Sequence, residues 1–422
     1  SVDAFSSLVL LVITGAAAAA LLAAKPSIDQ QIEAERQPLF YSAWLLVLSG
    51  LVGIVVSADA FNIFVFMEIS SLASYILIAG GPDRRALPAV FKYLMMGTIG
   101  ATFYLIGVGL IYMMTGTLNL ADMEARIGDV TDINPILVAA GFITIGLALK
   151  AAVFPLHVWV PNAYTHAPHM VTVFLAACAT KVALYVLIRF DYMVFQTKLD
   201  DHEIQFAMFL MPLAILGILI ASAVAMFEGH LKRLLASSSI AQIGYILLGA
   251  SFLSLAGLTA SAMHIFNHAL AKGGLFLAVA CLAYQYRDLR LNQLGGASAR
   301  MPWTCAAFVV CGLSLIGVPG TAGFISKWVL INAALENGAW GWALVAVILV
   351  SSLMAVVYIW RIVEALYFQE PVEGDDQISE APVQILLVTG LVAVLNIYFG
   401  LFPQVPLELA NSAAVLLLEG SR

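Results

Sequence analysis

The sequence predicts an all-α, polytopic membrane protein with about 12 transmembrane helices, arranged as two inverted five-helix repeats with broken helices. Its composition differs from that of soluble globular proteins, because 62% of its 422 residues are hydrophobic and 11% are charged. Many apolar residues form runs of about 20, the length that crosses a bilayer as a helix. Proline-rich or glycine-rich segments interrupt two of these runs, which is typical of discontinuous membrane helices.

The apolar runs place the predicted spans along the chain. The first six cover residues 4–24, 40–58, 60–80, 87–115, 135–159 and 169–190. The second six cover residues 204–226, 234–255, 258–286, 303–332, 339–367 and 382–402. The apolar tail from Pro406 to Leu418 is too short to cross a bilayer, so we expect an interfacial helix there. The chain opens without an initiator methionine or a basic leader, so we expect either that a leader has been removed or that the true N-terminus is missing.

Charged residues between the spans predict the orientation. The net charge of −7 comes largely from connecting segments, which hold Asp200, Asp201, Glu203, Glu373, Asp375, Asp376 and Glu380, and it excludes a nucleic-acid surface. Arg126 and Lys198, with Arg189 at a span edge, lie on one side of the membrane. The other side, which we expect to be cytoplasmic by the positive-inside rule, holds Lys25, Arg36, Arg84, Arg85, Lys232, Arg233, Arg287, Arg290 and Arg300.

An internal repeat supports the inverted arrangement. The segment ISSLASYILIAG from Ile69 resembles SSIAQIGYILLGA from Ser238, and GLALK from Gly146 resembles GLSLI from Gly312. The partners lie five spans apart, and because five is odd the two units must insert with opposite orientation. We therefore predict an N-terminal span and loop at 1–39, repeats at 40–190 and 204–367, and a C-terminal span and tail at 382–422.

Lysines beside the interruptions are the first candidate functional residues. Lys150 and Lys181 lie within apolar spans and are separated by Pro155, Pro161 and Pro168. A lysine at bilayer depth costs about 2.5–3.5 kcal/mol on insertion scales, so it requires partners, water or a function. A second interruption, GVPGTAGFISKW, has Lys327 after it, whereas Lys150 precedes the first. Both breaks indicate a proton or cation path, with structural ion pairs or snorkelling as the alternative, chiefly for Lys327.

Glu68 lies in the apolar segment FNIFVFMEISSLASYIL. A buried carboxylate must either be protonated or face a cation, so we expect a lysine partner. One alternative is a static ion pair. The other is a pair that changes as a proton arrives, which the excess of lysines over acids favours.

His264, His268 and Lys272 are spaced at i, i+4 and i+8, which places them on one face of a helix. Histidine titrates near neutral pH, so the column suits a proton relay, with hydrogen-bonded core histidines as the alternative. No metal site is expected, because the two histidines have no evident third ligand. Cys178, Cys281, Cys305 and Cys311 lack CxxC spacing and are expected to be small core residues.

The proline-rich connection also holds His157, His166 and His169, which we expect at a membrane face. These histidines could border an access path for protons, together with Lys232 at the start of the eighth span. Surface histidines and a positive-inside anchor are the alternatives.

Three segments carry a resemblance to a known family: DAFNIFVFMEISSLASYIL, LALKAAVFPLHVWVPNAYTHAP and ATKVALYVLIRF. They resemble the antiporter-like subunits shared by Mrp-type multi-subunit cation/proton antiporters and the membrane arm of respiratory complex I. GTLNLADM after the fourth span suits the D-type member of the Mrp Na⁺/H⁺ antiporter, whereas GVPGTAG departs from the break that many relatives have. The resemblance implies that roughly two N-terminal spans of the family are missing.

The resemblance also implies roles for the candidate residues. Glu68 would pair with a lysine of its own half and modulate Lys150, and Lys181 would bridge toward the second half. His264, His268 and Lys272 would continue the path, and Lys327 would end it.

The function implied is that of a transporter subunit without its own cofactor, which moves protons in a multi-subunit Na⁺/H⁺ antiporter of a bacterial plasma membrane. Its partners would be other membrane subunits, protons, and Na⁺ or another monovalent cation. One alternative is a pumping subunit of a complex I-like or membrane-hydrogenase redox complex, whose redox motifs would lie in partner subunits. Another is a membrane subunit of an inorganic-carbon uptake system, although scaffolding does not explain the roughly 12–18 kcal/mol insertion cost of five mid-span charges.

Overall fold

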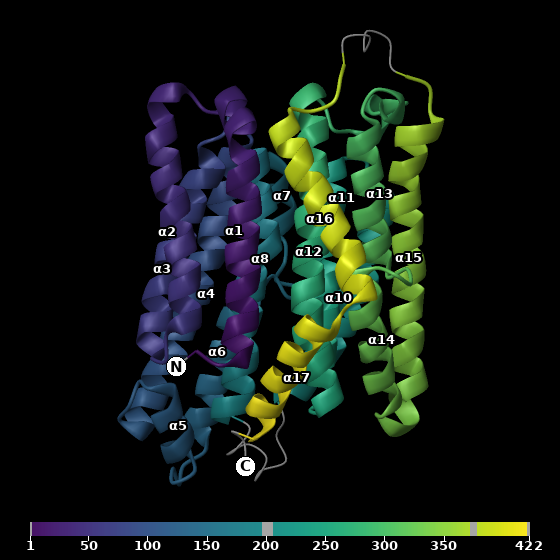
Figure 1. The fold of residues 1–422 in the computed structure, drawn as a ribbon. Coiled ribbons are helices and arrows are strands. Elements are labelled where there is room, and N and C mark those ends of the chain that lie inside the picture. Colours follow the sequence, from purple (N-terminus) through teal and green to yellow (C-terminus); the bar gives the residue numbers. More distant parts are fainter. Residues whose placement is uncertain (1, 196–205, 372–377, 420–422) are drawn as a thin grey trace.

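The computed structural model describes residues 2–195, 206–371 and 378–419 as a bundle of helices (Figure 1). Within these residues the chain forms no β-strand, only two isolated bridges. Part of the predicted charge pattern lies outside the described residues, namely Lys198, Asp200, Asp201, Glu203, Glu373, Asp375 and Asp376.

The helices follow the predicted spans closely. The N-terminal half contains α1 (Ala4–Gln31), α2 (Gln37–Val56), α3 (Ala60–Ala79), α4 (Ala86–Thr115), α5 (Leu120–Ile127), α6 (Asn134–Ala151), α7 (Val160–His166) and α8 (His169–Arg189), which continues as a π-helical turn, Phe190–Phe195. The C-terminal half contains α10 (Phe206–Phe227), α11 (Leu231–Ala250), α12 (Leu255–Gln285), α13 (Pro302–Ile316), α14 (Ala322–Leu335), α15 (Gly341–Phe368), α16 (Val383–Leu401) and α17 (Gln404–Glu419).

Eleven helices among the described residues are long and apolar enough to cross a membrane. The tenth predicted run, 303–332, is divided between α13 and α14, so the break predicted there is confirmed. The run predicted at 135–159 is not one helix either, because α6 ends at Ala151 and α7 begins only at Val160. Both first half-helices end in a left-handed cap, with φ of 59° at Ala152 and 91° at Gly317, a conformation that stops a helix.

The two isolated bridges show the inverted relation between the repeats. Asp59, before α3, pairs with Asn119, which follows α4, and His230, before α11, pairs with Arg290, which follows α12. His230 and Arg290 line a cavity together with Asp83, which lies at the far end of α3 from Asp59. The same kind of isolated bridge therefore occurs at opposite faces of the molecule. The residue boundaries given for the repeats stay a prediction.

One membrane face collects the basic loops. The loops after α3, α10 and α12 meet around shared cavities lined by Asp83, Arg85, His230 and Arg290. We call this side the basic face. Both chain ends lie at the other end of the bundle (Figure 1). The grouping of these loops agrees with the predicted orientation, and the assignment of the basic face to the cytoplasm stays a prediction.

Three helices form the centre of the bundle. In their most apolar windows, 94% of the residues of α11 and 89% of those in α8 and α12 are buried, against 28% for α16. The tail helix α17 packs on α1 and α12 and buries Ala410, Ala413 and Ala414 (Figure 1). Lys181, His264, His268 and Lys272 therefore lie on two of these three central helices, α8 and α12.

Helices α4 and α6 approach each other through facing glycines. A Cβ on Gly146 would lie 2.5 Å from the Gly100 carbonyl oxygen and 2.7 Å from the Tyr104 nitrogen. Small residues let membrane helices approach this closely. Since Lys150 follows one turn later on α6, this contact fixes the position of its side chain.

We predict that Gly146→Ala separates α4 from α6 and costs about 1–3 kcal/mol, as overpacking typically does. The purified variant should melt at a lower temperature than the wild type in detergent. Gly141→Ala is the matched control, because a Cβ at this position of α6 would meet no atom within 4 Å. Equal melting temperatures for the two variants would contradict the packing argument.

Candidate functional site

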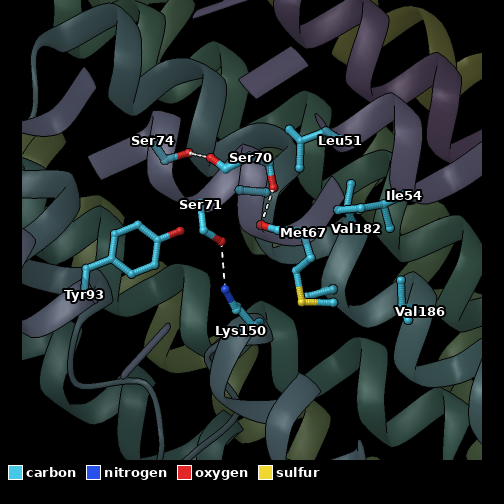
Figure 2. Close-up of a pocket in the computed structure, with 12 residues that line it drawn as sticks. Leu51, Ile54, Met67, Ser70, Ser71, Ser74, Tyr93, Lys150, Val182 and Val186 are labelled. Atoms are coloured by element: carbon cyan, nitrogen blue, oxygen red, sulfur yellow. Dashed lines mark hydrogen bonds between the residues drawn. The ribbon is translucent and has the colours of Figure 1, made fainter. Parts of the chain in front are cut away.

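The first part of the site is an ion pair between α3 and α6. The Lys150 Nζ donates hydrogen bonds to Glu68 Oε1 at 3.0 Å and to Ser71 Oγ at 2.8 Å. The Lys150 side chain is 6% exposed and that of Glu68 is 26% exposed. Figure 2 shows the ammonium group pointing at the serine-bearing face of α3. The buried ammonium group of Lys150 therefore has both a carboxylate and a hydroxyl group as partners.

A small cavity extends from this pair toward α8. Its volume is about 30 Å³, and it is lined by Ser70, Ser71, Ser74, Lys150 and side chains of α8 that include Val182 and Val186 (Figure 2). A water molecule needs about 10–15 Å³ of such space and two or more polar partners, and the serine and lysine side chains supply them. The cavity can therefore hold water between Lys150 and the helix that carries Lys181.

Lys181 lies at the centre of the bundle with no exposed surface. Its Nζ donates to the carbonyl oxygen of Ala176 on the same helix. It interacts electrostatically with His264, His268 and Lys272 on α12. Among the described residues, no carboxylate lies within ion-pair distance of Lys181.

The column predicted on α12 is present, and all three side chains are buried. His264 contacts Ser326 Oγ through Nδ1 at 2.8 Å and Gln242 Oε1 through Nε2 at 3.0 Å. The rings of His264 and His268 are stacked, with centroids 6.1 Å apart. Neither ring nitrogen of His268 has a hydrogen-bond partner among the described residues.

Lys272 ends the column on α12. Its Nζ donates to the Leu235 carbonyl at 2.7 Å and to Ser238 Oγ at 2.5 Å, both on α11. In the repeat, Ser238 occupies the place on α11 that Glu68 occupies on α3, as alignment on Tyr75 and Tyr245 shows. The second repeat thus gives its lysine a hydroxyl where the first gives a carboxylate.

Lys327 uses the second helix break. Its Nζ donates to the carbonyl oxygens of Leu315 at 3.2 Å and Ile316 at 2.8 Å, and to Ser352 Oγ on α15 at 3.0 Å. The ammonium group also lies 4.9 Å from the centre of the Tyr245 ring. The carbonyls at a helix C-terminus carry partial negative charge, so the broken end of α13 stabilises the cation. Glycine suits position 317 because its φ of 91° lies in the left-handed region, which residues with a Cβ rarely adopt.

The structure thus connects the candidate residues in part. Glu68 contacts Lys150, Lys181 acts on the α12 column, and His264 and Lys327 meet around Tyr245. We call these residues the buried row: Glu68, Lys150, Lys181, His264, His268, Lys272 and Lys327. Lys150 and residues of α8 line the same small cavity.

Sequence reasoning missed the polar partners of the buried row. These partners are Ser71, Ser238, Gln242, Ser326 and Ser352. The signal that could have found the first three is the pair of serine-rich segments, ISSLAS and SSSIAQ, at matching places in the two repeats.

The proposed access residues separate into two groups. His166 and His169 line a cavity of about 730 Å³ on the basic face together with Lys232. His166 contacts Asp83 Oδ2 through Nδ1 at 2.8 Å, and the Lys232 Nζ donates to the Ala167 carbonyl at 2.8 Å. His157 lies apart, in the break between α6 and α7, where its ring stacks on Phe154.

Asp83 stays ionised in this cavity. Burial alone would raise its pKa, but hydrogen bonds from Arg85 and the pairing with His166 outweigh burial and lower the pKa to about 2. Among the described residues, no three His, Cys, Asp or Glu side chains gather as metal ligands. The four cysteines are free and buried, as predicted.

Comparison with known proteins identifies the family. The family model described as NADH:quinone oxidoreductase/Mrp antiporter, transmembrane, matches residues 57–393. The chain belongs to this family. The resemblance found in the sequence is therefore confirmed, and so is the prediction of a multi-pass membrane protein.

Two relatives represent the two branches of the family. The chain is 42% identical to the N-type subunit of NADH-quinone oxidoreductase from Desulforudis audaxviator, over 83% of this chain and 69% of the relative. It is 29% identical to the D-type subunit of the Na⁺/H⁺ antiporter from Alkalihalophilus pseudofirmus, over 88% of this chain and 74% of the relative. Membership of the antiporter-like family is shown, and sequence identity does not favour the Mrp branch over the complex I branch.

Two solved structures show the same fold. A chain of the Mrp complex from Dietzia sp. DQ12-45-1b matches with a TM-score of 0.88 and 27% identity, over 99% of this chain and 84% of that chain. A chain of the membrane-bound sulfane sulfur reductase, an archaeal respiratory complex, matches with a TM-score of 0.89 and 31% identity, over 99% and 83%. Both chains come from multi-subunit membrane complexes, which agrees with the prediction of membrane-subunit partners.

His230, at the edge of the basic-face cavity, gives a pH prediction. Burial lowers its pKa, and the nearby Lys232 ammonium lowers it further, to about 4 from an ordinary 6.5. In the unfolded chain the His230 ring is therefore protonated below about pH 6.5. In the folded chain the ring becomes protonated only near pH 4. The stability that His230 contributes is complete above pH 6.5 and falls as the pH drops toward 4.

We predict that the melting temperature of His230→Gln is closer to that of the wild type at pH 5 than at pH 8. The variant has no imidazole at this position, so it does not share the wild type's loss of stability at low pH. Melting temperatures of the purified proteins in detergent between pH 4 and pH 8 measure the difference. A difference between the two curves that stays constant with pH would show that His230 carries no such linkage.

Proposed function

We propose that this chain moves protons across the membrane along the buried row, as a subunit of a larger membrane complex. The observation that supports this most strongly is the placement of four lysines, two histidines and one glutamate inside apolar helices. Ionisable side chains at bilayer depth are costly and typically mark proton or ion pathways. An inert scaffold would gain nothing from this cost.

The contacts and the small cavity support one order of transfer along the row. A proton held by the Lys150–Glu68 pair would pass to Lys181 through water in the 30 Å³ cavity. From Lys181 it would reach His268 and Lys272, then His264, and finally Lys327. His268 suits the middle of this path, because its two unpaired ring nitrogens call for water partners in a buried setting.

Glu68 would control the first transfer. While it contacts Lys150, the carboxylate stabilises the ammonium form of that lysine. If the contact opens, Lys150 loses this stabilisation and its proton moves toward Lys181. Because the other lysines of the row have neutral oxygen partners, a proton on one of them repels a proton on the next.

Protons would enter from the basic face. His166, His169 and Lys232 line the 730 Å³ cavity there and form the proposed access site. His157 lies in the broken segment between α6 and α7 and would belong to the interior rather than to this opening. The cavity lining includes three histidines, which can bind and release protons but are poor ligands for Na⁺, so it suits access by protons better than access by Na⁺.

Two assemblies fit this chain. In the first, proton movement is exchanged for Na⁺ or another monovalent cation, as the 29% identity to the D-type subunit of an Na⁺/H⁺ antiporter suggests. In the second, a redox reaction in partner subunits drives it, as the 42% identity to the N-type subunit of an NADH-quinone oxidoreductase suggests. In neither case would this chain carry out catalysis by itself.

We predict that Glu68→Ala, Lys150→Ala and Lys327→Ala fold and assemble but slow proton transport about tenfold or more, which corresponds to at least about 1.4 kcal/mol on the limiting barrier. Proton flux is measured with the purified complex in liposomes. The matched control is Lys92→Ala, because Lys92 is an exposed lysine on α4 outside the row. Wild-type flux in all three variants would refute the proposed path.

The two assemblies are separated by purifying the intact complex from its native membrane. An antiporter should contain no redox subunits and should show Na⁺-dependent proton flux without an electron donor. A redox pump should co-purify with cofactor-bearing subunits and should move protons only during electron transfer. A complex that moves no protons under either condition would reject both.

A further inference from the structure

A second cavity on the basic face is surrounded by arginines. Its volume is about 600 Å³, and it lies beside the 730 Å³ cavity, with which it shares Arg85, Thr165, His166, His230 and Arg290. Three further charged residues, Glu228, Arg233 and Arg361, complete its charged lining. Four guanidinium groups and one carboxylate thus face this space, in a chain whose net charge is −7.

Ion pairing neutralises only part of this charge. Arg85 pairs with Asp83, Arg233 with Glu228, and Arg290 with Asp288 at 3.0, 3.2 and 3.7 Å. Arg361 has no carboxylate partner among the described residues, and it donates instead to the carbonyls of Met226 and Glu228.

The neighbouring cavity adds Lys232, which binds main-chain carbonyls, and Arg287. The two cavities together therefore carry six cationic side chains against three carboxylates, an excess that a bound anion would balance.

The geometry suits a phosphate group. Guanidinium groups bind phosphate oxygens through paired hydrogen bonds and are weakly hydrated, so they are the preferred phosphate partners. Arg361 is held in place by carbonyls at the end of α10, while Arg233 begins α11 and Arg290 lies beyond α12. A ligand contacting all three would join the ends of four helices.

Aromatic side chains beside the cavity indicate a lipid rather than a soluble anion. Phe227, which precedes the cavity residue Glu228, is 83% exposed, and Trp360, which precedes Arg361, is 55% exposed. Arg361 lies about two turns from the end of α15 on the basic face. At this depth lipid phosphates meet acyl chains, and exposed aromatic residues are typical of that boundary.

We propose that this arginine-lined cavity binds the headgroup of an anionic phospholipid, whose acyl chains lie over Phe227 and Trp360. A basic pocket between helix ends is the usual form of such a site. The bound lipid would link Arg85 of the first repeat to Arg233, Arg290 and Arg361 of the second. It would thereby hold the two repeats together at the basic face, away from the buried row.

The test uses the intact complex, purified and stripped of loosely bound lipid. Mixed micelles containing phosphatidylglycerol or diphosphatidylglycerol should raise its melting temperature, and phosphatidylcholine should not. Mass spectrometry should detect retained anionic lipid. In the double variant Arg233→Gln/Arg361→Gln, the retained lipid should fall about tenfold, the factor that corresponds to a loss of about 1.4 kcal/mol.

The matched control is Arg36→Gln, an exposed arginine of the loop before α2 that lines neither cavity. It should retain lipid as the wild type does. Arg361→Lys provides a second variant that keeps the charge, and it should retain more lipid than the double variant if the latter is still folded.

Three outcomes would overturn the proposal. One is equal stabilisation by phosphatidylcholine. Another is stabilisation by inorganic pyrophosphate at matched ionic strength with no effect of anionic lipid, which would indicate a soluble anion. The third is an intact complex that retains no anionic lipid because an acidic segment of a partner protein fills the cavity.

Discussion

An ammonium group held inside a membrane needs oxygen atoms around it, and this requirement explains where the helices break. An unbroken helix uses its carbonyls internally, so it has few to offer a buried cation. The end of α13 at Ile316 frees two carbonyls, and Lys327 binds both. Lys150 lies in the last turn of α6, just before the other break, and finds its oxygens on α3 instead. The breaks and the lysines are therefore parts of one arrangement.

The two repeats provide different partners for their lysines, so the two ends of the row differ in charge balance. In the first repeat the lysine precedes the break and faces Glu68, so the pair is close to neutral. In the second repeat Ser238 replaces the carboxylate, and neutral oxygens surround Lys272 and Lys327. An added proton is therefore balanced by a countercharge at one end of the row and repelled by its neighbours at the other. On the proposed function, transport would depend on moving charge between these two environments.

The sequence was sufficient to predict the spans, the break before Lys327 and the ionisable residues inside the helices, because hydropathy and charges within apolar runs are local signals. The role of these residues in transport stays a prediction. It did not reveal where the helix resumes after Ala151, since proline marks an interruption but not its length. The hydroxyl partners Ser71, Ser238 and Ser326 were also missed. Serine is common in membrane helices because it allows close packing. Only the three-dimensional contacts therefore distinguish a serine that hydrogen-bonds a residue of the row from one that serves packing alone. The branch of the family stayed open because both branches share the fold that these signals describe.

The buried row contains residues of both halves of the chain, so a movement of one helix can affect residues of both halves. Lys181 belongs to α8 in the first half, yet its electrostatic neighbours lie on α12 in the second. Helix α12 packs against α8 on one side and α14 on the other, so it connects Lys181 with the helix that carries Lys327. A small rotation of α12 would change the distances from His268 to Lys181 and from His264 to Ser326 together. Because α12 is 31 residues long and packs against α8, α11 and α14, such a movement would be transmitted along the row from Lys181 to Lys327.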